Sequence, residues 1–450
     1  MADSIQAPGL SPAGAALQVK IAARTAVVAV IGAGYVGLPL AVALAKAGFP
    51  VICIDKNQQR VALINSGQSY IRDVAEAELA NLVRARKVEA TDSFAALGQA
   101  DIIVACVPTP LTETKDPDIS YIEDAARQIA ASLRPGQLIS LESTTYPGTA
   151  EEVVLPLLAA TGLQVGTDFF LCHSPERVDP GNAQFNTANT NKVVGGVTPA
   201  CLLLASAFYA QIVPRVVPVS SPRVAEMTKL FENTYRAVNI ALVNELTLLC
   251  ERMGLNVWEV VEAASTKGFG IQTFWPGPGV GGHCIALDPL YLAWKAREYD
   301  FSTRFIELAT EINLRMPHFV KERLVRVLGE AGRALPGARI LVLGVAYKRD
   351  VPDARESPAL KLIQLLKREG ADVVYHDPWV PEVHPEGWFK HHLQSVPLTD
   401  QLWESVAAVV ITTDHTNVDY AEVCRRAPLV LDTRNATKGV AQATARVVKL

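Results

Sequence analysis

The chain has 450 residues, of which 49% are hydrophobic and 20% are charged, and its formal net charge at pH 7 is −4. This composition is typical of a globular protein and excludes a disordered one, and at ~100–200 residues per domain the length suggests about two to four domains. A mildly acidic chain has no overall attraction to nucleic acid or to an anionic membrane, so any anionic ligand requires a local basic site.

The seven cysteines are irregularly spaced and form no CxxC motif, so the sequence predicts neither a disulfide framework nor a metal centre. Unpaired cysteines favour a reducing compartment, and we expect a cytoplasmic protein. Residues 1–22 lack the basic segment and the continuous apolar stretch of a signal peptide, and we interpret them as a flexible tail. Residues 25–54 are apolar enough to resemble a membrane span, but glycines interrupt them, and we expect no membrane association.

The first part of the chain alternates strands and helices. Residues 26–37 predict a β-branched strand, a glycine turn and the start of a helix, and residues 49–55 predict the next strand. A strand, a helix and a strand within about 30 residues indicate a βαβ unit with a buried parallel sheet. Further buried apolar runs follow, so residues 23–215 are predicted to form one doubly wound α/β domain.

The remainder predicts a helical centre and a second α/β domain. Residues 222–254 contain no internal glycine or proline and repeat apolar residues at helical spacing, which predicts one long helix. We expect this helix to bridge two domains and to carry a dimer interface. We assign residues 216–325 to a central helical domain and residues 326–450, with apolar strands and an amphipathic helix, to a second doubly wound parallel-sheet domain.

A GxGxxG motif connects the first strand to the first helix. Its residues are Gly32, Ala33, Gly34, Tyr35, Val36 and Gly37. In this context the glycines permit a tight turn, a close pyrophosphate and close packing, while the acidic Asp55 after the second strand bonds the ribose hydroxyls. The acid disfavours a 2′-phosphate, which indicates NAD rather than NADP. Lys56 and Arg60 are near enough to the motif to leave NADP open.

A glycine-rich stretch, "GPGVGGHCIALDP", precedes Cys284. Glycines 277, 279, 281 and 282 permit close ligand approach, and they present the cysteine rather than bury it. If a helix begins there, Asp288 lies one turn past the sulfur, as a base or a group that orients water. The alternative is a structural loop with an incidental cysteine, and this stretch alone favours neither.

Lys229 and Asn233 lie four residues apart on the predicted long helix and share one face with Glu226. Such a pair on an otherwise apolar helix is usually solvated surface. It is also a possible pair of donors to an oxyanion, and the pattern alone leaves both interpretations open.

Together these motifs resemble the UDP-glucose/GDP-mannose dehydrogenase family over about residues 24–440. The matching motifs are "VIGAGYVGLPLA" with Asp55, "VPTP" (107–110), "ESTTYPGT" (142–149), "SPERVDPGN" (174–182), "EMTKLFENTYRAVNIALVNE" (226–245), "GPGVGGHCIALDP" (277–289), "GVAYKRDVPDARESPA" (344–359) and "LDTRNAT" (431–437). Within the family, the chain is most similar to the UDP-N-acetylglucosamine 6-dehydrogenases.

The resemblance implies two Rossmann-like domains joined by a helical one, and a homodimer or larger oligomer. It implies a four-electron oxidation that converts the sugar C6 hydroxyl to a carboxylate with two NAD⁺, for surface polysaccharide precursors. Cys284 matches the family nucleophile, which would hold the aldehyde as a thiohemiacetal and then as a thioester.

Other roles follow from the resemblance residue by residue. Lys229 and Asn233 would stabilise negative charge at C6, and Asp288 would assist the cysteine or orient water. Thr144 would lie near the nicotinamide, and Glu176 at the sugar. The residues assigned to the cofactor also include Val107, Pro108 and Thr109. The residues assigned to the UDP-sugar also include Arg177, Lys267, Phe274, Gly277, Gly281, Lys348 and Arg434.

The chain departs from the family in one place. After the first glutamate, UDP-glucose dehydrogenases usually have a second one, and this chain lacks it in the corresponding stretch, Arg177 and residues 178–181. The difference argues against UDP-glucose as the substrate. It also suggests that Arg177 shapes a pocket for an N-acetyl group. The alternatives are UDP-N-acetylmannosamine or UDP-glucose as substrate, a two-electron dehydrogenase with a structural Cys284, and a non-catalytic protein that binds NAD and nucleotide sugars.

Overall fold

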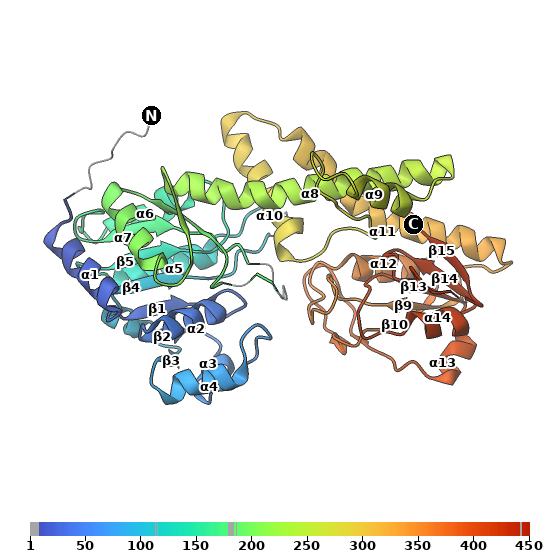
Figure 1. Ribbon diagram of the computed structural model, residues 1–450, viewed down its shortest axis with the longest axis horizontal. Helices are drawn as coiled ribbons and strands as arrows, with labels where there is room; N and C mark the ends of the chain where they lie inside the picture. Colours follow the sequence, from blue (N-terminus) through green and yellow to red (C-terminus); the bar gives the residue numbers. More distant parts are fainter. Residues whose placement is uncertain (1–8, 113, 115, 179–183, 186, 442) are drawn as a thin grey trace. The chain divides into compact units, whose positions relative to one another are not determined.

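The computed structural model describes residues 9–112, 114, 116–178, 184–185, 187–441 and 443–450. It divides into two compact units, Met1–Glu232 and Asn233–Leu450. The units have separate sheets and separate hydrophobic cores. Figure 1 shows the elements of each unit.

The first unit is built on an eight-stranded sheet with the order β3-β2-β1-β4-β5-β6-β7-β8. Its strands are β1 (Val28–Ile31), β2 (Val51–Ile54), β3 (Val88–Thr91), β4 (Ile102–Ala105), β5 (Leu138–Leu141), β6 (Phe170–His173), β7 (Lys192–Gly196) and β8 (Val216–Val219). All neighbours pair in parallel except β6 and β7. The order of the first six strands is that of a dinucleotide-binding fold, in which the ligand lies where the order reverses, here between β1 and β4.

Helices cover this sheet on both faces, and each face has its own apolar core. They are α1 (Pro12–Ala23), α2 (Gly37–Ala47), α3 (Gln58–Asn65), α4 (Glu76–Arg84), α5 (Ser120–Ser132), α6 (Leu155–Ala159) and α7 (Pro199–Tyr209), with the short segments η1 (Phe94–Gln99) and η2 (Thr149–Val154). The predicted doubly wound α/β fold is confirmed. The strand β8 lies just past residue 215, where the sequence analysis ended this domain.

The prediction of a flexible tail over residues 1–22 is wrong from residue 12 onward, because this segment forms the helix α1. The Ser11 hydroxyl accepts a hydrogen bond from the Gly14 N–H, at 3.1 Å, and so caps the helix. Leu17 and Ile21 are only 2% and 1% exposed. They belong to the core of the first unit, where α1 contacts α7. Residues 1–8 lie outside the described part of the chain.

The long helix predicted over residues 222–254 is α8 (Pro222–Met253), which begins with a proline and is followed by Gly254, as helix ends prefer. The division between the units falls inside it, after Glu232. α8 therefore belongs to both units, as the prediction of a bridging helix requires.

The second unit contains a five-stranded, all-parallel sheet with the order β10-β9-β13-β14-β15. Its strands are β9 (Arg339–Leu343), β10 (Asp372–His376), β13 (Ala408–Ile411), β14 (Leu429–Asp432) and β15 (Arg446–Lys449), and a separate antiparallel ribbon pairs β11 (Glu382–Val383) with β12 (Leu393–Gln394). The helices are α9 (Val257–Ser265), α10 (His283–Ala296), α11 (Arg304–Glu330), α12 (Pro358–Arg368), α13 (Asp400–Ser405) and α14 (Tyr420–Arg426), with the short η3 (Arg297–Tyr299). This is the second predicted parallel-sheet domain. Among the described residues, no helix is long and apolar enough to span a bilayer.

Candidate active site

The GxGxxG turn lies between β1 and α2, at the point where the strand order reverses. A Cβ on Gly32 would lie 2.4 Å from the carbonyl oxygen of Cys106, and one on Gly37 would lie 1.8 Å from the carbonyl oxygen of Gly32. Both positions therefore require glycine for packing. A Cβ on Gly34 would have no atom within 4 Å, so this glycine faces open space. This arrangement gives a pyrophosphate access to the backbone at the N-terminus of α2.

Asp55 follows β2 and is 9% exposed. Its carboxylate accepts hydrogen bonds from the backbone N–H groups of Ala33, at 3.0 Å, and Asn57, at 2.8 Å. The Arg60 guanidinium also contacts it, at 3.3 Å, whereas Lys56 pairs with Asp124 at 2.7 Å. The acid is thus fixed beside the glycine turn, and Lys56 is engaged elsewhere.

The loop after β4 carries Val107, Pro108 and Thr109, of which Thr109 is 5% exposed. The Ser143 hydroxyl accepts from the Val107 N–H and donates to the Val107 carbonyl oxygen, each at 2.9 Å. Sequence reasoning missed Ser143, although it stands directly before the predicted Thr144. It connects the ends of the neighbouring strands β4 and β5 and so sets the shape of the crevice.

Glu176 belongs to a buried ionic cluster that sequence reasoning did not find. The Lys192 ammonium lies 2.8 Å from Glu142 and 3.2 Å from Glu176, and the Tyr209 hydroxyl donates to Glu142 at 2.6 Å. Burial alone would lower the pKa of Lys192, but the two neighbouring carboxylates raise it above its ordinary value. Burial opposes ionisation of Glu176, but Lys192 and the backbone N–H groups of residues 177 and 178 hold its pKa below the ordinary value. Glu176 is therefore an ionised, fixed acceptor.

Arg177 forms an ion pair with Glu232 on α8 and donates to the Asn191 carbonyl oxygen at 2.9 Å. These contacts give its guanidinium a structural role in the first unit. A contribution to an N-acetyl pocket stays a prediction, and residues 179–181 of the same motif lie outside the described residues.

The predicted helix face with Glu226, Lys229 and Asn233 is buried, since these side chains are only 1%, 8% and 3% exposed. The solvated-surface interpretation is therefore wrong. The Glu226 carboxylate accepts from the N–H groups of Gly148, at 2.6 Å, and Ala150, at 2.9 Å. It holds the start of η2, and burial raises its pKa to about 7. Glu226 is thus a structural group, whereas Lys229 and Asn233 keep their predicted roles as proposals.

Cys284 lies in the first turn of α10, as expected, and its side chain is exposed. Asp288 follows one turn later and is 2% exposed. The Asn233 amide donates to the Asp288 carboxylate at 2.6 Å, which joins two of the predicted catalytic residues in the second unit. The nucleophile candidate is accessible, and the carboxylate near it on the helix is oriented by a buried amide.

The four glycines before Cys284 fit against neighbouring atoms with almost no space. A Cβ on Gly277 would lie 2.7 Å from the Arg434 guanidinium. A Cβ on Gly281 or Gly282 would lie 2.8 Å from Tyr347, and Gly279 and Gly282 have φ angles of 131° and 81°. The loop therefore needs glycine both for its backbone conformation and for its approach to residues 344–358 and Arg434. This packing sets the start of α10 and hence the position of Cys284.

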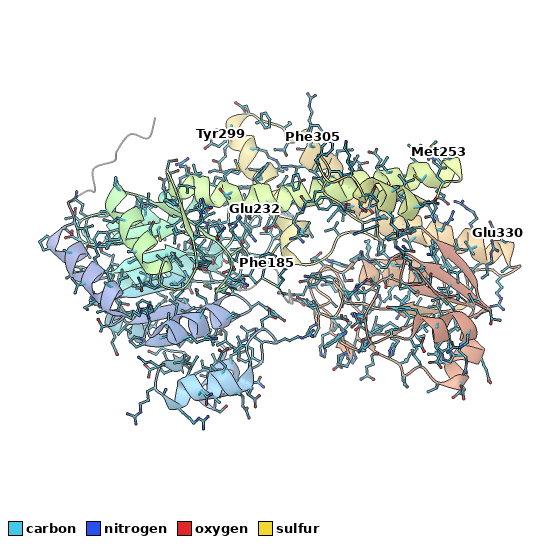
Figure 2. The ribbon with its side chains drawn as sticks, in the orientation of Figure 1. Phe185, Glu232, Met253, Tyr299, Phe305 and Glu330 are labelled. Atoms are coloured by element: carbon cyan, nitrogen blue, oxygen red, sulfur yellow. The ribbon has the colours of Figure 1, made fainter. Side chains whose placement is uncertain are left out.

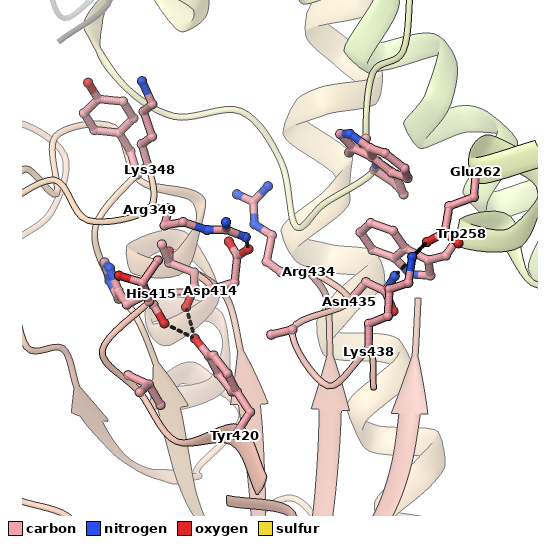
Figure 3. Close-up of a pocket in the computed structure, with 17 residues that line it drawn as sticks. Trp258, Glu262, Lys348, Arg349, Asp414, His415, Tyr420, Arg434, Asn435 and Lys438 are labelled. Carbon is pink, nitrogen blue, oxygen red and sulfur yellow. Dashed lines mark hydrogen bonds and ion pairs between the residues drawn. The ribbon is translucent and has the colours of Figure 1, made fainter. Parts of the chain in front are cut away.

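A cavity of about 720 Å³ lies in the second unit, near the carboxyl ends of β9, β13 and β14. Figure 3 shows its lining, which includes Lys348 and Arg434 from the prediction. Sequence reasoning missed the cationic Arg349 and Lys438, which pair with Asp414 and Glu262 respectively. Burial, together with Arg349, lowers the pKa of Arg434 to about 10, so it stays cationic at neutral pH. This cationic cavity is suited to a diphosphate.

Two further features shape the cavity. The Trp258 and Trp275 rings stack 6.1 Å apart with 19° between their planes, and both rings line the cavity.

The second feature is a hydrogen-bond network around the buried His415. Its Nδ1 accepts a hydrogen bond from the Asp350 N–H at 3.0 Å, so the ring proton is on Nε2, which donates to the Asp377 carboxylate at 3.1 Å. Asp377 in turn accepts from the N–H groups of residues 345 and 346, and this network holds the loop that carries Lys348.

The remaining predicted substrate residues lie elsewhere in the second unit. Lys267 places its ammonium 4.8 Å from the centre of the Phe269 ring, and Phe274 packs edge-on against Tyr235 at 5.9 Å. Neither is among the described residues that line the cavity. Their roles stay predictions.

Comparison with protein families finds three matches along the chain. Models of the UDP-glucose/GDP-mannose dehydrogenase family match its NAD-binding domain at residues 26–213, its central domain at residues 223–315 and its UDP-binding domain at residues 341–439.

Individual relatives are similar over nearly their whole length. The UDP-N-acetyl-D-mannosamine dehydrogenase of Pyrococcus horikoshii is 36% identical, with 91% of this chain and 96% of the relative covered. The UDP-N-acetyl-D-glucosamine 6-dehydrogenase of Pseudomonas aeruginosa is 37% identical, with 78% and 83% covered. The structure of the P. horikoshii enzyme has a TM-score of 0.85 at 34% identity and covers 94% of this chain and 98% of its own. The relatives thus share the architecture but differ in the sugar that they are named for.

Proposed function

Because the chain belongs to the UDP-glucose/GDP-mannose dehydrogenase family, we propose that it is an NAD-dependent enzyme that oxidises the C6 hydroxyl of UDP-N-acetylglucosamine to a carboxylate. The observation that carries the proposal is the exposed Cys284 at the start of α10, with the buried Asn233–Asp288 pair one turn away. A two-electron dehydrogenase has no need of an accessible thiol in this position. A four-electron enzyme needs one to retain the aldehyde.

NAD⁺ bound at the glycine turn supplies a hydride acceptor at each of two oxidations. The C6 alcohol loses a hydride and a proton and becomes an aldehyde. The Cys284 thiol adds across the carbonyl group to give a thiohemiacetal, which loses a second hydride and proton and becomes a thioester. Water then releases the carboxylate and regenerates the thiol.

The side chains have separate tasks in this sequence. Lys229 and Asn233 stabilise negative charge on the C6 oxygen, and Asp288 orients the hydrolytic water or receives a proton from it. Lys348 and Arg434 bind the diphosphate, and the Trp258–Trp275 stack offers a planar apolar surface to the uracil ring. Glu176, ionised and fixed by Lys192, accepts from sugar hydroxyls.

The test is the number of NADH molecules formed per sugar when UDP-N-acetylglucosamine is limiting and NAD⁺ is in excess. Two NADH, with the uronate as product, support the proposal. One NADH means that the reaction stops at the aldehyde or at a ketone, and contradicts it. The Cys284→Ser variant is the control, because it should form no more than one NADH per sugar at any appreciable rate.

UDP-N-acetylmannosamine is the second candidate substrate, because the relative of that specificity matches 91% of this chain. A panel of the two N-acetylated sugars and UDP-glucose separates the candidates by kcat/KM. A protein that binds NADH and UDP-sugars without any turnover would instead be a non-catalytic binding protein.

Two further proposals concern the context of the enzyme. We propose a homodimer formed through the central helices, where Leu242, Leu246, Leu249 and Met253 of α8 are exposed at helical spacing. We place the reaction in the cytoplasm, since the seven cysteines are all unpaired.

A further inference from the structure

The ribbon of β11 and β12 presents a polar face that no part of the proposed reaction uses. Glu382 pairs with Gln394 and Val383 with Leu393, so the same antiparallel register places His384 opposite His392. Side chains two apart in a strand share a face, and so do cross-strand partners. One face of the ribbon therefore holds Glu382, His384, His392 and Gln394.

The other face of the ribbon is apolar. Val383 is 6% exposed and belongs to the core of the second unit, and Leu393 packs against the same core. His391, one residue before His392, makes an edge contact with buried Phe389 at 5.4 Å. This alternation fixes the ribbon on the domain and holds the polar face toward solvent.

The two imidazoles on the polar face converge on one carboxylate. The Nε2 atom of His384 lies 3.4 Å from Oε2 of Glu382, and Nε2 of His392 contacts Oε1 of the same group. The rings stack 5.3 Å apart with 16° between their planes. One ligand atom from each of the three residues lies within 4.8 Å of the others.

The distance from His384 Nε2 to Glu382 Oε2 equals the donor spacing around a small divalent ion. Two ligands at roughly 2.0–2.1 Å from a tetrahedral zinc ion are roughly 3.4 Å apart. Two imidazole nitrogens and one carboxylate oxygen are a donor set that zinc accepts, with water in the fourth position. An ordinary surface ion pair explains one histidine on the carboxylate, whereas a bound ion explains both, because one ligand atom of each residue lies within 4.8 Å of the others.

We propose that Glu382, His384 and His392 form a binding site for a divalent transition-metal ion, with zinc as the fitting member, that clamps β11 to β12. The clamp has a physical purpose, since each strand is only two residues long and such a ribbon is marginal in water. Gln394 supports the site from the same face through a hydrogen bond to Glu382. The site is structural, and it is independent of the oxidation chemistry.

The test is a zinc titration of the metal-free full-length protein by calorimetry. The variant is His384→Gln/His392→Gln, and the matched control is His391→Gln, which removes an imidazole from the neighbouring position outside the site. We expect one equivalent of zinc on the wild type and the control, and binding weakened at least tenfold in the double variant. Equal zinc binding by all three proteins, or none by the wild type, overturns the proposal.

Two measurements localise the ion. Trypsin cleavage after exposed Lys390, which lies between the two strands, should slow several-fold with zinc in the wild type and the control but not in the double variant. Cobalt(II) in place of zinc should give visible d–d absorption without an intense near-ultraviolet band, because such a band would indicate a thiolate ligand such as Cys284 and contradict the assignment. The double variant should keep the NADH stoichiometry of the wild type.

Discussion

Lys192 connects the predicted sugar ligand Glu176 to a buried carboxylate that the sequence did not reveal. We predict that Lys192→Met moves the acidic limb of the pH dependence of kcat/KM upward, because Lys192 lowers the pKa of Glu176. The variant should also unfold more easily by ~3–5 kcal/mol, since Glu142 then stays buried without a cation.

Two variants separate positioning from stability. Lys192→Arg should restore the pH limb, because it keeps the charge between the two carboxylates. The double variant Lys192→Met/Glu142→Gln should recover the free energy of unfolding, while the acidic limb of the pH dependence of kcat/KM stays shifted upward. A pH profile unchanged in Lys192→Met would show that the cluster is merely structural.

Gly282, at the N-terminus of α10, shows how an element positions a single atom. We predict that Gly282→Ala lowers kcat by roughly 100-fold, because a methyl group at 2.8 Å from the Tyr347 ring displaces the turn that presents Cys284. The φ of 81° and ψ of 162° form a conformation that is essentially restricted to glycine, so alanine adds strain of about 1–3 kcal/mol. Steady-state kinetics and urea unfolding measure the two effects.

The matched control for this substitution is Gly268→Ala, since a Cβ there would meet no atom within 4 Å. It should keep both kcat and stability. Wild-type turnover in Gly282→Ala would mean that the glycine loop does not set the position of the thiol.

The contact between α8 and η2 depends on pH through Glu226. Burial raises the pKa of Glu226 from 4.5 to about 7, so its proton-linked stabilisation is fully present below pH 4.5 and is lost as the pH rises through about 7. At about 1.4 kcal/mol per pKa unit, the loss is roughly 3 kcal/mol at most.

We predict that Glu226→Gln removes this slope between pH 5 and pH 8 in urea unfolding. It should also lower stability at low pH, because an amide has one acceptor for two backbone donors. Glu245→Gln, an exposed glutamate of the same helix, is the control. A slope retained in Glu226→Gln would assign the pH dependence to another group.

At the scale of the whole molecule, the second half of α8 exposes a line of apolar side chains at helical spacing. Leu242, Leu246, Leu249 and Met253 are 38–61% exposed, and Phe305 at the start of α11 is 77% exposed. Figure 2 labels Met253 and Phe305. A line of exposed apolar side chains on one helix, as on α8, is typical of a surface that a partner covers. We predict that Leu249→Glu converts a dimer to a 48.5 kDa monomer in light scattering, whereas Val19→Glu on α1 leaves the dimer intact. A wild-type monomer contradicts the dimer.

The sequence predicted the elements whose hydrophobic period is strong and local. These include β1 with its glycine turn, the whole of α8 and the amphipathic α12. It missed α1 because the burial of Leu17 depends on the distant α7. It also missed the partners of Glu176, since Lys192 and Glu142 are 50 residues apart and only the sheet brings them together. Motif reasoning finds residues that contact a ligand more readily than residues that position those ligand-contacting side chains.

The seven cysteines differ in how far solvent reaches their sulfur atoms. Cys284 is exposed, while five other cysteines are buried and Cys106 is half-buried. Burial raises the pKa of the Cys53 and Cys172 thiols to about 12, which suppresses their thiolate forms. We therefore expect iodoacetamide to modify one sulfur per chain and to abolish turnover in proportion, as followed by intact-mass spectrometry. With Cys284 as the proposed nucleophile, the extent of alkylation would count working catalytic centres in any preparation, and we expect peroxide to inactivate the enzyme through the same sulfur.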